Sequence, residues 1–201
     1  MFTGIIRFTG EIIGIQSFSY GKRLQIKAEE VFIKQLEEGI SSVSIDGACH
    51  TVEKIQGNSF IVFSSFETLR RSTIENLKKG SRVNLELPVT PESFLDGHIV
   101  QGHIDGIGRI SSIQKKGETY LYRFLTENSI LKYLVEKDSI AIDGISLTIF
   151  DIDSSSFRVA LIPQTMKHTT LCSKHEDDTV NIEINVMAKY AEKFFKKNVK
   201  V

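Results

Sequence analysis

The chain has 201 residues, of which 41% are hydrophobic, enough for one large domain or two small ones. Its 25 basic and 25 acidic residues cancel, so no large field favours a polyanion, and nucleic acid is a poor candidate partner. No apolar run approaches the roughly 18 to 20 residues of a membrane-spanning helix. The apolar start lacks a basic leading segment and is broken by Arg7 and Glu11. We therefore expect a soluble cytoplasmic protein without a membrane contact.

In the first half, apolar residues that alternate with other residues predict strands with one buried face at 24–28, 43–45 and 83–87. A helix is expected at 31–38, with Gly39 as its C-terminal stop. Asp46-Gly47 predicts a tight turn, and Gln-Gly-Asn after Ile55 predicts another. Connections of this kind join neighbouring antiparallel strands.

A linker is predicted at 88–97, because this stretch contains two of the three prolines of the chain. Beyond it, alternating residues predict strands at 157–161 and 180–184. A helix is expected at 129–135, with Asn128 as its N-cap. The second half therefore has the same kinds of elements as the first.

The two halves align as copies of one domain. Residues 42–86 match residues 139–183 without a gap, and fourteen of the 45 pairs are identical. A duplicated set of short strands predicts a mainly β fold of two tandem closed six-stranded antiparallel Greek-key β-barrels with short helices, because closure removes exposed sheet edges. The expected organisation is a first barrel at 1–87, the linker at 88–97, a second barrel at 98–186 and a C-terminal helix at 187–201.

The tail differs from both repeats. A helix from 187 to 197 carries an apolar stripe on one side. Its members are Met187, Tyr190, Ala191, Phe194 and Phe195. The stripe indicates self-association, and packing against the chain's own barrel is the alternative.

Small polar side chains follow the two Asp-Gly turns at matching places. Cys49 and Thr51 share one face of a strand, and Ser146 and Thr148 share the same face of its copy. Such side chains either bond to local backbone or line a site. Their presence in both halves favours two similar sites for similar ligands.

Each half opens with a glycine, Gly4 in the first and Gly102 in the second. A glycine within a strand marks a bulge or a close approach to another group, and a flat heterocycle is one candidate. His103 is a candidate general acid or base because imidazole titrates near neutral pH, although a lone histidine is more often structural. The spacing of His98 and His103 does not predict a metal site, and two cysteines are too few for a disulfide framework.

Three motifs stand in order along the chain: Met1-Phe2-Thr3-Gly4-Ile5, Val100-Gln101-Gly102-His103-Ile104-Asp105-Gly106 and Ile142-Asp143-Gly144-Ile145-Ser146-Leu147-Thr148. With these motifs the chain resembles the riboflavin synthase α-chain family over essentially its whole length. The resemblance implies a homotrimer held partly by C-terminal helices, without cofactor or metal. Each active site would lie between the first barrel of one subunit and the second barrel of another.

The resemblance also implies a reaction, the last step of riboflavin biosynthesis. A transferase of this family converts two molecules of 6,7-dimethyl-8-ribityllumazine into riboflavin and 5-amino-6-ribitylaminouracil by transfer of a four-carbon unit. Because donor and acceptor are the same compound, two near-identical pockets that hold the rings in contact supply the orientation of an otherwise bimolecular encounter.

The resemblance further implies roles for single residues. His103, helped by Thr148, is the candidate for proton transfer, Cys49 or Ser42 for addition at C7, and Asp143 is a further position expected to influence the reaction. In the second barrel the implied substrate contacts are Gly4, Ile5, Ile6, Gly102, His103, Ile104, Ser146, Leu147 and Thr148, with a strand wall of Ala160, Leu161, Ile162, Pro163, Gln164 and Thr165. In the first barrel they are Ala48, Cys49 and His50, with a strand of Phe63, Ser64, Ser65, Phe66, Glu67 and Thr68. Lys137 is expected to reach a ribityl chain in the adjoining subunit.

Two residues depart from the family pattern. His50 stands where leucine is usual and Asp46 where the first copy often has asparagine, so we expect a more polar first pocket.

Two other functions compete with the enzyme. A non-catalytic lumazine protein, an optical antenna, has the same fold but tends to lose the polar motif of one barrel, which this chain keeps in both. A barrel that binds oligonucleotides or another protein needs a basic groove with exposed aromatic residues, and the neutral charge and lack of tryptophan argue against it.

Overall fold

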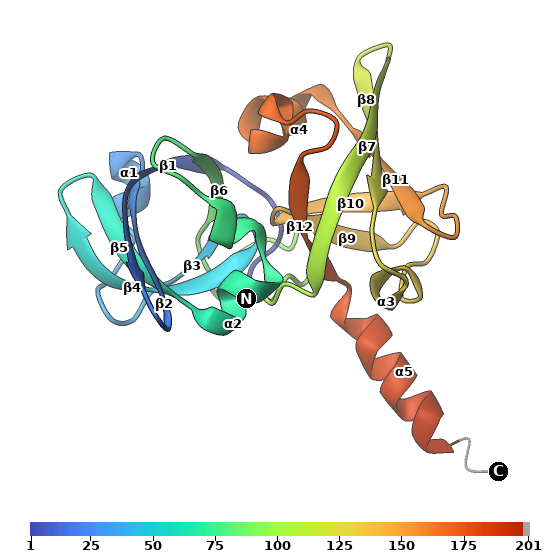
Figure 1. The fold of residues 1–201 in the computed structure, drawn as a ribbon, viewed down its shortest axis with the longest axis horizontal. Helices are drawn as coiled ribbons and strands as arrows, with labels where there is room; N and C mark the ends of the chain where they lie inside the picture. The colour runs from blue at the N-terminus through green and yellow to red at the C-terminus, as the bar shows by residue number, and fades with distance from the viewer. Residues whose placement is uncertain (199–201) are drawn as a thin grey trace.

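The computed structural model describes residues 1–198 of the chain. Two closed six-stranded antiparallel β-barrels lie beside each other, and a C-terminal helix projects away from both (Figure 1). The predicted fold class is confirmed. Residues 199–201 of the predicted tail lie outside the described residues. Within residues 1–198, no helix combines the length and apolar character needed to cross a membrane.

The first barrel has the strand order β1-β2-β5-β4-β3-β6. Its elements are β1 (Phe8–Phe18), β2 (Gly21–Lys27), α1 (Glu30–Ile33), β3 (Ser42–Ile45), β4 (Ala48–Gln56), β5 (Ser59–Ser65), α2 (Phe66–Arg71) and β6 (Arg82–Glu86).

The second barrel has the same circular strand order when the elements are matched in chain order. Its elements are β7 (Gly106–Lys116), β8 (Thr119–Leu125), α3 (Asn128–Leu131), β9 (Ser139–Ile142), β10 (Ile145–Phe150), β11 (Ser156–Leu161), α4 (Pro163–His168) and β12 (Thr179–Ile184). The terminal helix is α5 (Val186–Asn198).

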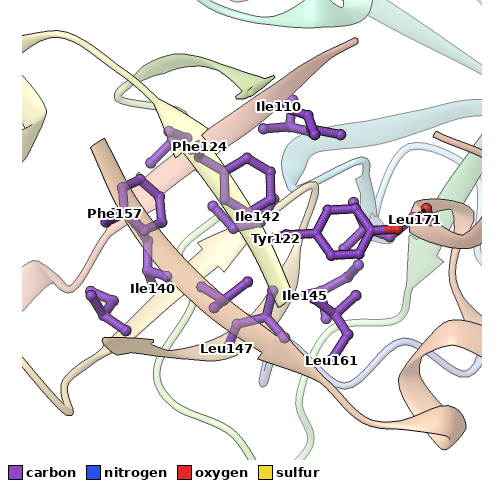
Figure 2. Packing of buried hydrophobic residues seen from close by; sticks show 14 of the residues in the cluster. Ile110, Tyr122, Phe124, Ile140, Ile142, Ile145, Leu147, Phe157, Leu161 and Leu171 are labelled. Carbon is purple, nitrogen blue, oxygen red and sulfur yellow. Dashed lines mark hydrogen bonds between the residues drawn. The ribbon is translucent and has the colours of Figure 1, made fainter. Parts of the chain in front are cut away.

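The core of each barrel consists of the inward-facing residues of its strands. Figure 2 shows this packing in the second barrel, where Tyr122, Phe124 and Phe157 stack among isoleucine and leucine side chains. The Tyr122 hydroxyl donates a hydrogen bond to the carbonyl oxygen of Leu171 at 3.1 Å, so the one polar group of this cluster is satisfied. Residues that alternate with the core face outward, which leaves the outer surface of each barrel free to carry a site.

The helix predictions need correction. α1 ends at Ile33, not near 38, and α3 ends at Leu131, not at 135. Each of these helices has one buried pair of residues over the barrel, and the chain then turns to reach the next strand. Asn128 is the first helical residue of α3 and not its N-cap, and the cap residue Glu127 makes no side-chain capping bond. The predicted Asp46-Gly47 turn is present, with positive φ angles of 44° and 83°.

The two barrels contact each other through a buried polar interface with pseudo-twofold symmetry. The Asn84 side chain donates to the carbonyl oxygen of Asp143 at 2.9 Å and accepts the backbone N–H of Thr170 at 2.8 Å. Asn181, at the same place in the second barrel, donates to the carbonyl oxygen of Asp46 at 2.8 Å. Because the partners of both asparagines are backbone groups of the opposite barrel, these hydrogen bonds fix the orientation of one barrel relative to the other.

Candidate functional site

The segment that precedes each barrel crosses over to the other barrel. Phe2 and Val100 pair in the middle of this crossing, with N–H to O distances of 2.7 and 3.1 Å. The backbone N–H of Ser146 in β10 donates to the carbonyl oxygen of Gly4 at 2.8 Å. The crossing thus brings the opening residues of the chain to the second barrel.

The second crossing repeats this geometry in the first barrel. The backbone N–H of Cys49 in β4 donates to the carbonyl oxygen of Gly102 at 2.9 Å. Both glycines have positive φ angles, 77° at Gly4 and 84° at Gly102, and a Cβ on Gly102 would lie 2.5 Å from the Cβ of Cys49. Glycine is required here because the two backbones approach too closely for any side chain.

Two buried glutamates hold the crossing segments in place. Glu86 at the end of β6 accepts the backbone N–H and hydroxyl of Thr3 at 2.7 and 2.8 Å, and the N–H of Gly4 at 3.1 Å. Glu183 at the end of β12 accepts the N–H groups of residues 101, 102 and 103 at 2.6, 2.9 and 3.0 Å. Burial raises the pKa of both carboxyl groups, and the bonds to N–H groups oppose that rise.

Each crossing closes a cavity on the outer surface of a barrel. The first-barrel cavity has a volume of about 350 Å³ and is lined by Ala48, Cys49, Glu67, Thr68, Arg71, Gly102, His103, Ile104, Asp105 and Lys189. The second-barrel cavity has a volume of about 440 Å³ and is lined by Gly4, Ile5, Ile6, Arg7, Ile145, Ser146, Ile162, Gln164, Thr165, His168 and Thr169.

The two cavities are built from corresponding residues of the repeat. Cys49 corresponds to Ser146, Thr68 to Thr165, and the glycine of one crossing to that of the other. Every lining residue of the first-barrel cavity except Lys189 has its counterpart in the lining of the second. Two concave sites of like size and origin can therefore hold two copies of similar ligands.

Many of the residues expected in the site do line a cavity. In the first-barrel cavity these are Ala48, Cys49, Glu67, Thr68, Gly102, His103 and Ile104. In the second-barrel cavity they are Gly4, Ile5, Ile6, Ser146, Ile162, Gln164 and Thr165. One grouping was wrong: the segment from Gly102 to Ile104 was expected beside Ser146, and the crossing carries it to the opposite barrel.

The expected strand walls were also partly wrong. β5 ends at Ser65 and β11 ends at Leu161, so the polar residues that follow project from short helices. The Ser65 hydroxyl accepts the backbone N–H of Thr68 at 3.2 Å and caps α2. Pro163 occupies the first turn of α4, where its missing N–H costs no hydrogen bond.

Four expected contacts lie inside the barrels, away from the cavities. His50 and Ser64 are buried in the first barrel, and Leu147 and Leu161 take the corresponding places in the second. Nε2 of His50 lies 2.6 Å from the Ser64 hydroxyl, and Nδ1 lies 2.9 Å from the carbonyl oxygen of Ala48. Burial lowers the pKa of His50 to about 4, so the ring is neutral at pH 7. His50 therefore makes the barrel interior more polar, not the pocket.

Asp143 lines neither cavity. It is fully buried between the barrels, where its carboxylate accepts the N–H of Asn181 at 2.7 Å and lies 3.4 Å from Nζ of Lys174. Burial raises its pKa, and the nearby Lys174 ammonium opposes that rise. These contacts place Asp143 in the barrel interface and not in a cavity, and its expected influence on the reaction stays a prediction.

The other expected residues lie elsewhere on the surface. Ser42 pairs with Thr51 and Thr148 pairs with Ser139, on the same outer faces as Cys49 and Ser146 but two residue pairs further along the strands. Lys137 lines neither cavity, and its backbone N–H donates to the carbonyl oxygen of Ile149 at 2.9 Å. The remaining residues outside both cavities are Phe63, Ser65, Phe66, Ala160 and Pro163.

Sequence reasoning missed several polar residues with ionisable side chains that line the cavities. Arg71 and Asp105 line the first, and Arg7 and His168 line the second. Nδ1 of His98 also lies 2.7 Å from the Ser146 hydroxyl. The repeat alignment does point to the two glutamates that hold the crossing segments. Glu86 and Glu183 are identical in the two copies, and each stands at the end of a buried strand.

The fold matches solved structures of a lumazine-binding protein. The crystal structure of LumP complexed with 6,7-dimethyl-8-(1'-D-ribityl) lumazine gives a TM-score of 0.83, covering 92% of this chain and 99% of that chain at 21% identity. LumP complexed with riboflavin gives 0.82 at 24% identity, covering 92% and 100%. At these identities the likeness establishes the fold alone.

Comparison with other sequences extends to the family. Riboflavin synthase of Actinobacillus pleuropneumoniae is 40% identical over 197 residues, covering 98% of this chain and 91% of that protein. Riboflavin synthase of Bacillus subtilis (strain 168) is 36% identical over 197 residues with the same coverage. The lumazine binding domain matches twice, at residues 3–88 and 101–185. The chain belongs to the riboflavin synthase family and carries two lumazine binding domains.

Proposed function

We propose that the chain is a riboflavin synthase, a transferase that dismutates two molecules of 6,7-dimethyl-8-ribityllumazine into riboflavin and 5-amino-6-ribitylaminouracil. The observation that carries this proposal is the pair of cavities with corresponding linings. A reaction in which donor and acceptor are the same molecule needs two like sites, and this chain builds one on each barrel. The cytoplasmic location stays a prediction.

The two cavities of one chain are lined by separate sets of residues, one on each barrel, which agrees with an active site completed between subunits. We infer a homotrimer in which the first-barrel cavity of one subunit faces the second-barrel cavity of the next. α5 supports this arrangement, because Tyr190, Phe194 and Phe195 on it are 52, 63 and 72% exposed. Large aromatic side chains on one helix are a typical subunit contact.

The first-barrel cavity combines a thiol and an imidazole. Cys49 and His103 both line it, whereas Ser146 and Ile5 stand at the corresponding places of the other cavity. His103 is our candidate for moving the proton of the acidic C7 methyl group of a lumazine, and Cys49 our candidate for addition at C7. Holding the two rings in contact supplies the larger share of the acceleration.

The test is a steady-state assay with ribityllumazine as sole substrate. The parent should form riboflavin, and His103→Ala should lower kcat by roughly 10² or more, the usual contribution of a general acid or base. Ser146→Ala should raise KM several-fold by the loss of one hydrogen bond. His175→Ala is the matched control, because this histidine is 87% exposed and lines neither cavity, and it should keep parental activity.

Two outcomes would contradict these assignments. Parental rates in both His103→Ala and Ser146→Ala would refute the site. A parent that binds ribityllumazine and fluoresces, yet forms no riboflavin, would favour the antenna function.

A further inference from the structure

The first-barrel cavity has one lining residue that the repeat does not supply. Lys189 comes from α5, the helix after the second barrel, and it is the lining residue without a counterpart in the second-barrel cavity. β12 ends at Ile184 and α5 begins at Val186, so the second barrel fixes where this first helical turn lies.

Lys189 is ion-paired with Asp105 in this cavity. Nζ of Lys189 lies 2.6 Å from Oδ1 of Asp105, and Oδ2 accepts the backbone N–H of Ile184 at 2.9 Å. The N–H of Asp105 donates to the carbonyl oxygen of Ile182 at 2.8 Å. One oxygen of the Asp105 carboxylate thus binds the end of β12, and the other binds the first turn of α5.

Asp105 anchors one end of the segment that carries His103. At the other end, Glu183 accepts the N–H groups of Gly102 and His103 at 2.9 and 3.0 Å. Burial is the main cause of the raised pKa of Glu183, and the negative charge of Asp105 adds to it. Two carboxylates therefore approach one short segment, and the Lys189 ammonium neutralises one of them, Asp105, by direct pairing.

A second contact fixes the direction of α5. Glu192 accepts hydrogen bonds from the Tyr133 hydroxyl and, at 3.2 Å, from Nζ of Lys132, both in the second barrel. Lys189 and Glu192 are three residues apart and lie on one side of the helix. The helix then projects away from both barrels (Figure 1). Phe194, further along the helix, is exposed.

We propose that Lys189 is a positioning residue of the first-barrel cavity, which fixes Asp105 and through it the backbone of residues 102–105 that presents His103. The C-terminal helix is then part of this site as well as a surface for subunit contact. The catalytic consequence rests on the proposed function, whereas the ordering of residues 102–105 does not.

The test compares Lys189→Met and Lys189→Arg in the full chain. In Lys189→Met, the amide protons of Gly102 and His103 should exchange roughly tenfold faster, because their segment opens more readily. KM for ribityllumazine should rise about three- to tenfold with a smaller change in kcat, the size expected for a partly exposed ion pair that orients a site. Lys189→Arg keeps the charge and should stay within about twofold of the parent.

The matched control is Lys193→Met, a change of the same type one turn along α5 at an exposed position, which should change neither readout. Asp105→Asn is the second variant, in case Lys189→Met does not fold. If Lys189 acts through Asp105, the double variant should be no worse than Asp105→Asn alone.

Parental exchange and parental KM in Lys189→Met would overturn the proposal, as would additive losses in the double variant. If the parent forms no riboflavin, the proposed function fails, while the exchange rates of Gly102 and His103 still decide whether Lys189 orders the segment.

Discussion

Gly47 and Gly144 lie against each other where the two barrels meet. A Cβ on Gly47 would lie 2.7 Å from the backbone nitrogen of Gly144, and a Cβ on Gly144 would lie 2.9 Å from the nitrogen of Gly47. Each glycine follows an aspartate in a tight turn, so the repeated Asp-Gly element serves two purposes. It connects two strands within a barrel, and it lets the barrels approach.

Gly47→Ala should therefore lower the free energy of unfolding by about 3 kcal/mol, from the clash with backbone and from a residue with a side chain at φ +83°. Gly57→Ala is the matched control. Its φ is +56° and a Cβ there meets nothing within 4 Å, so only the backbone cost of about 1 kcal/mol applies. Urea unfolding of both variants checks the difference, and equal losses would show that the barrel contact is not tight.

The buried pair of His50 and Ser64 should make stability depend on pH. The folded-state pKa of His50 is about 4, below its ordinary value of 6.5, so the unfolded chain takes up a proton first as the pH falls. The stabilising contribution is present above pH 6.5 and is lost towards pH 4, by about 3 kcal/mol in total.

A double variant isolates this effect. His50→Leu with Ser64→Leu copies the arrangement of Leu147 and Leu161 in the second barrel, and it should remove the loss between pH 6.5 and 4. The buried carboxyl groups with raised pKa values, Asp143 among them, titrate with the opposite sign and are common to parent and variant. An unchanged pH profile in the double variant would falsify the assignment to His50.

The glutamates Glu86 and Glu183 should act on different cavities. Glu183→Ala leaves three backbone N–H groups without an acceptor, which should cost about 2 to 4 kcal/mol of unfolding free energy. Its faster amide exchange should be confined to residues 101–103. Glu86→Ala should speed exchange at residues 3–4 instead, and the two variants serve as controls for each other.

The exposed face of α5 should hold subunits together. Phe194→Glu places a charge at a position that is 63% exposed in a single chain, so the chain should still fold. The same charge should break an apolar subunit contact, because an unpaired carboxylate is costly to bury. Sedimentation velocity should show a shift from trimer towards monomer. A parent that sediments as a monomer, or a variant that sediments as the parent does, would contradict the inferred role of this helix.

The sequence by itself determined the duplication, the barrel class, and the two glycines, Gly4 and Gly102, at which one backbone segment approaches another. The alternating strands, the Asp-Gly turns and the matched pair Cys49 and Ser146 are all visible locally or by aligning one half with the other. These features depend on short-range geometry, and the same local pattern is present in both copies of the repeat. The lengths of α1 and α3 were not predictable, because packing of a single buried pair against the barrel decides where each helix ends.

Only the tertiary structure decided which residues share a cavity. The crossing of the opening segments sends His103 to the first barrel, and it depends on the hydrogen bonds of Glu183 and on the Phe2 and Val100 pair. The burial of Asp143 between barrels and the reach of Lys189 into the opposite barrel's cavity have the same origin. Contacts between residues some 80 positions apart follow from how two folded barrels pack, and no local pattern records that packing.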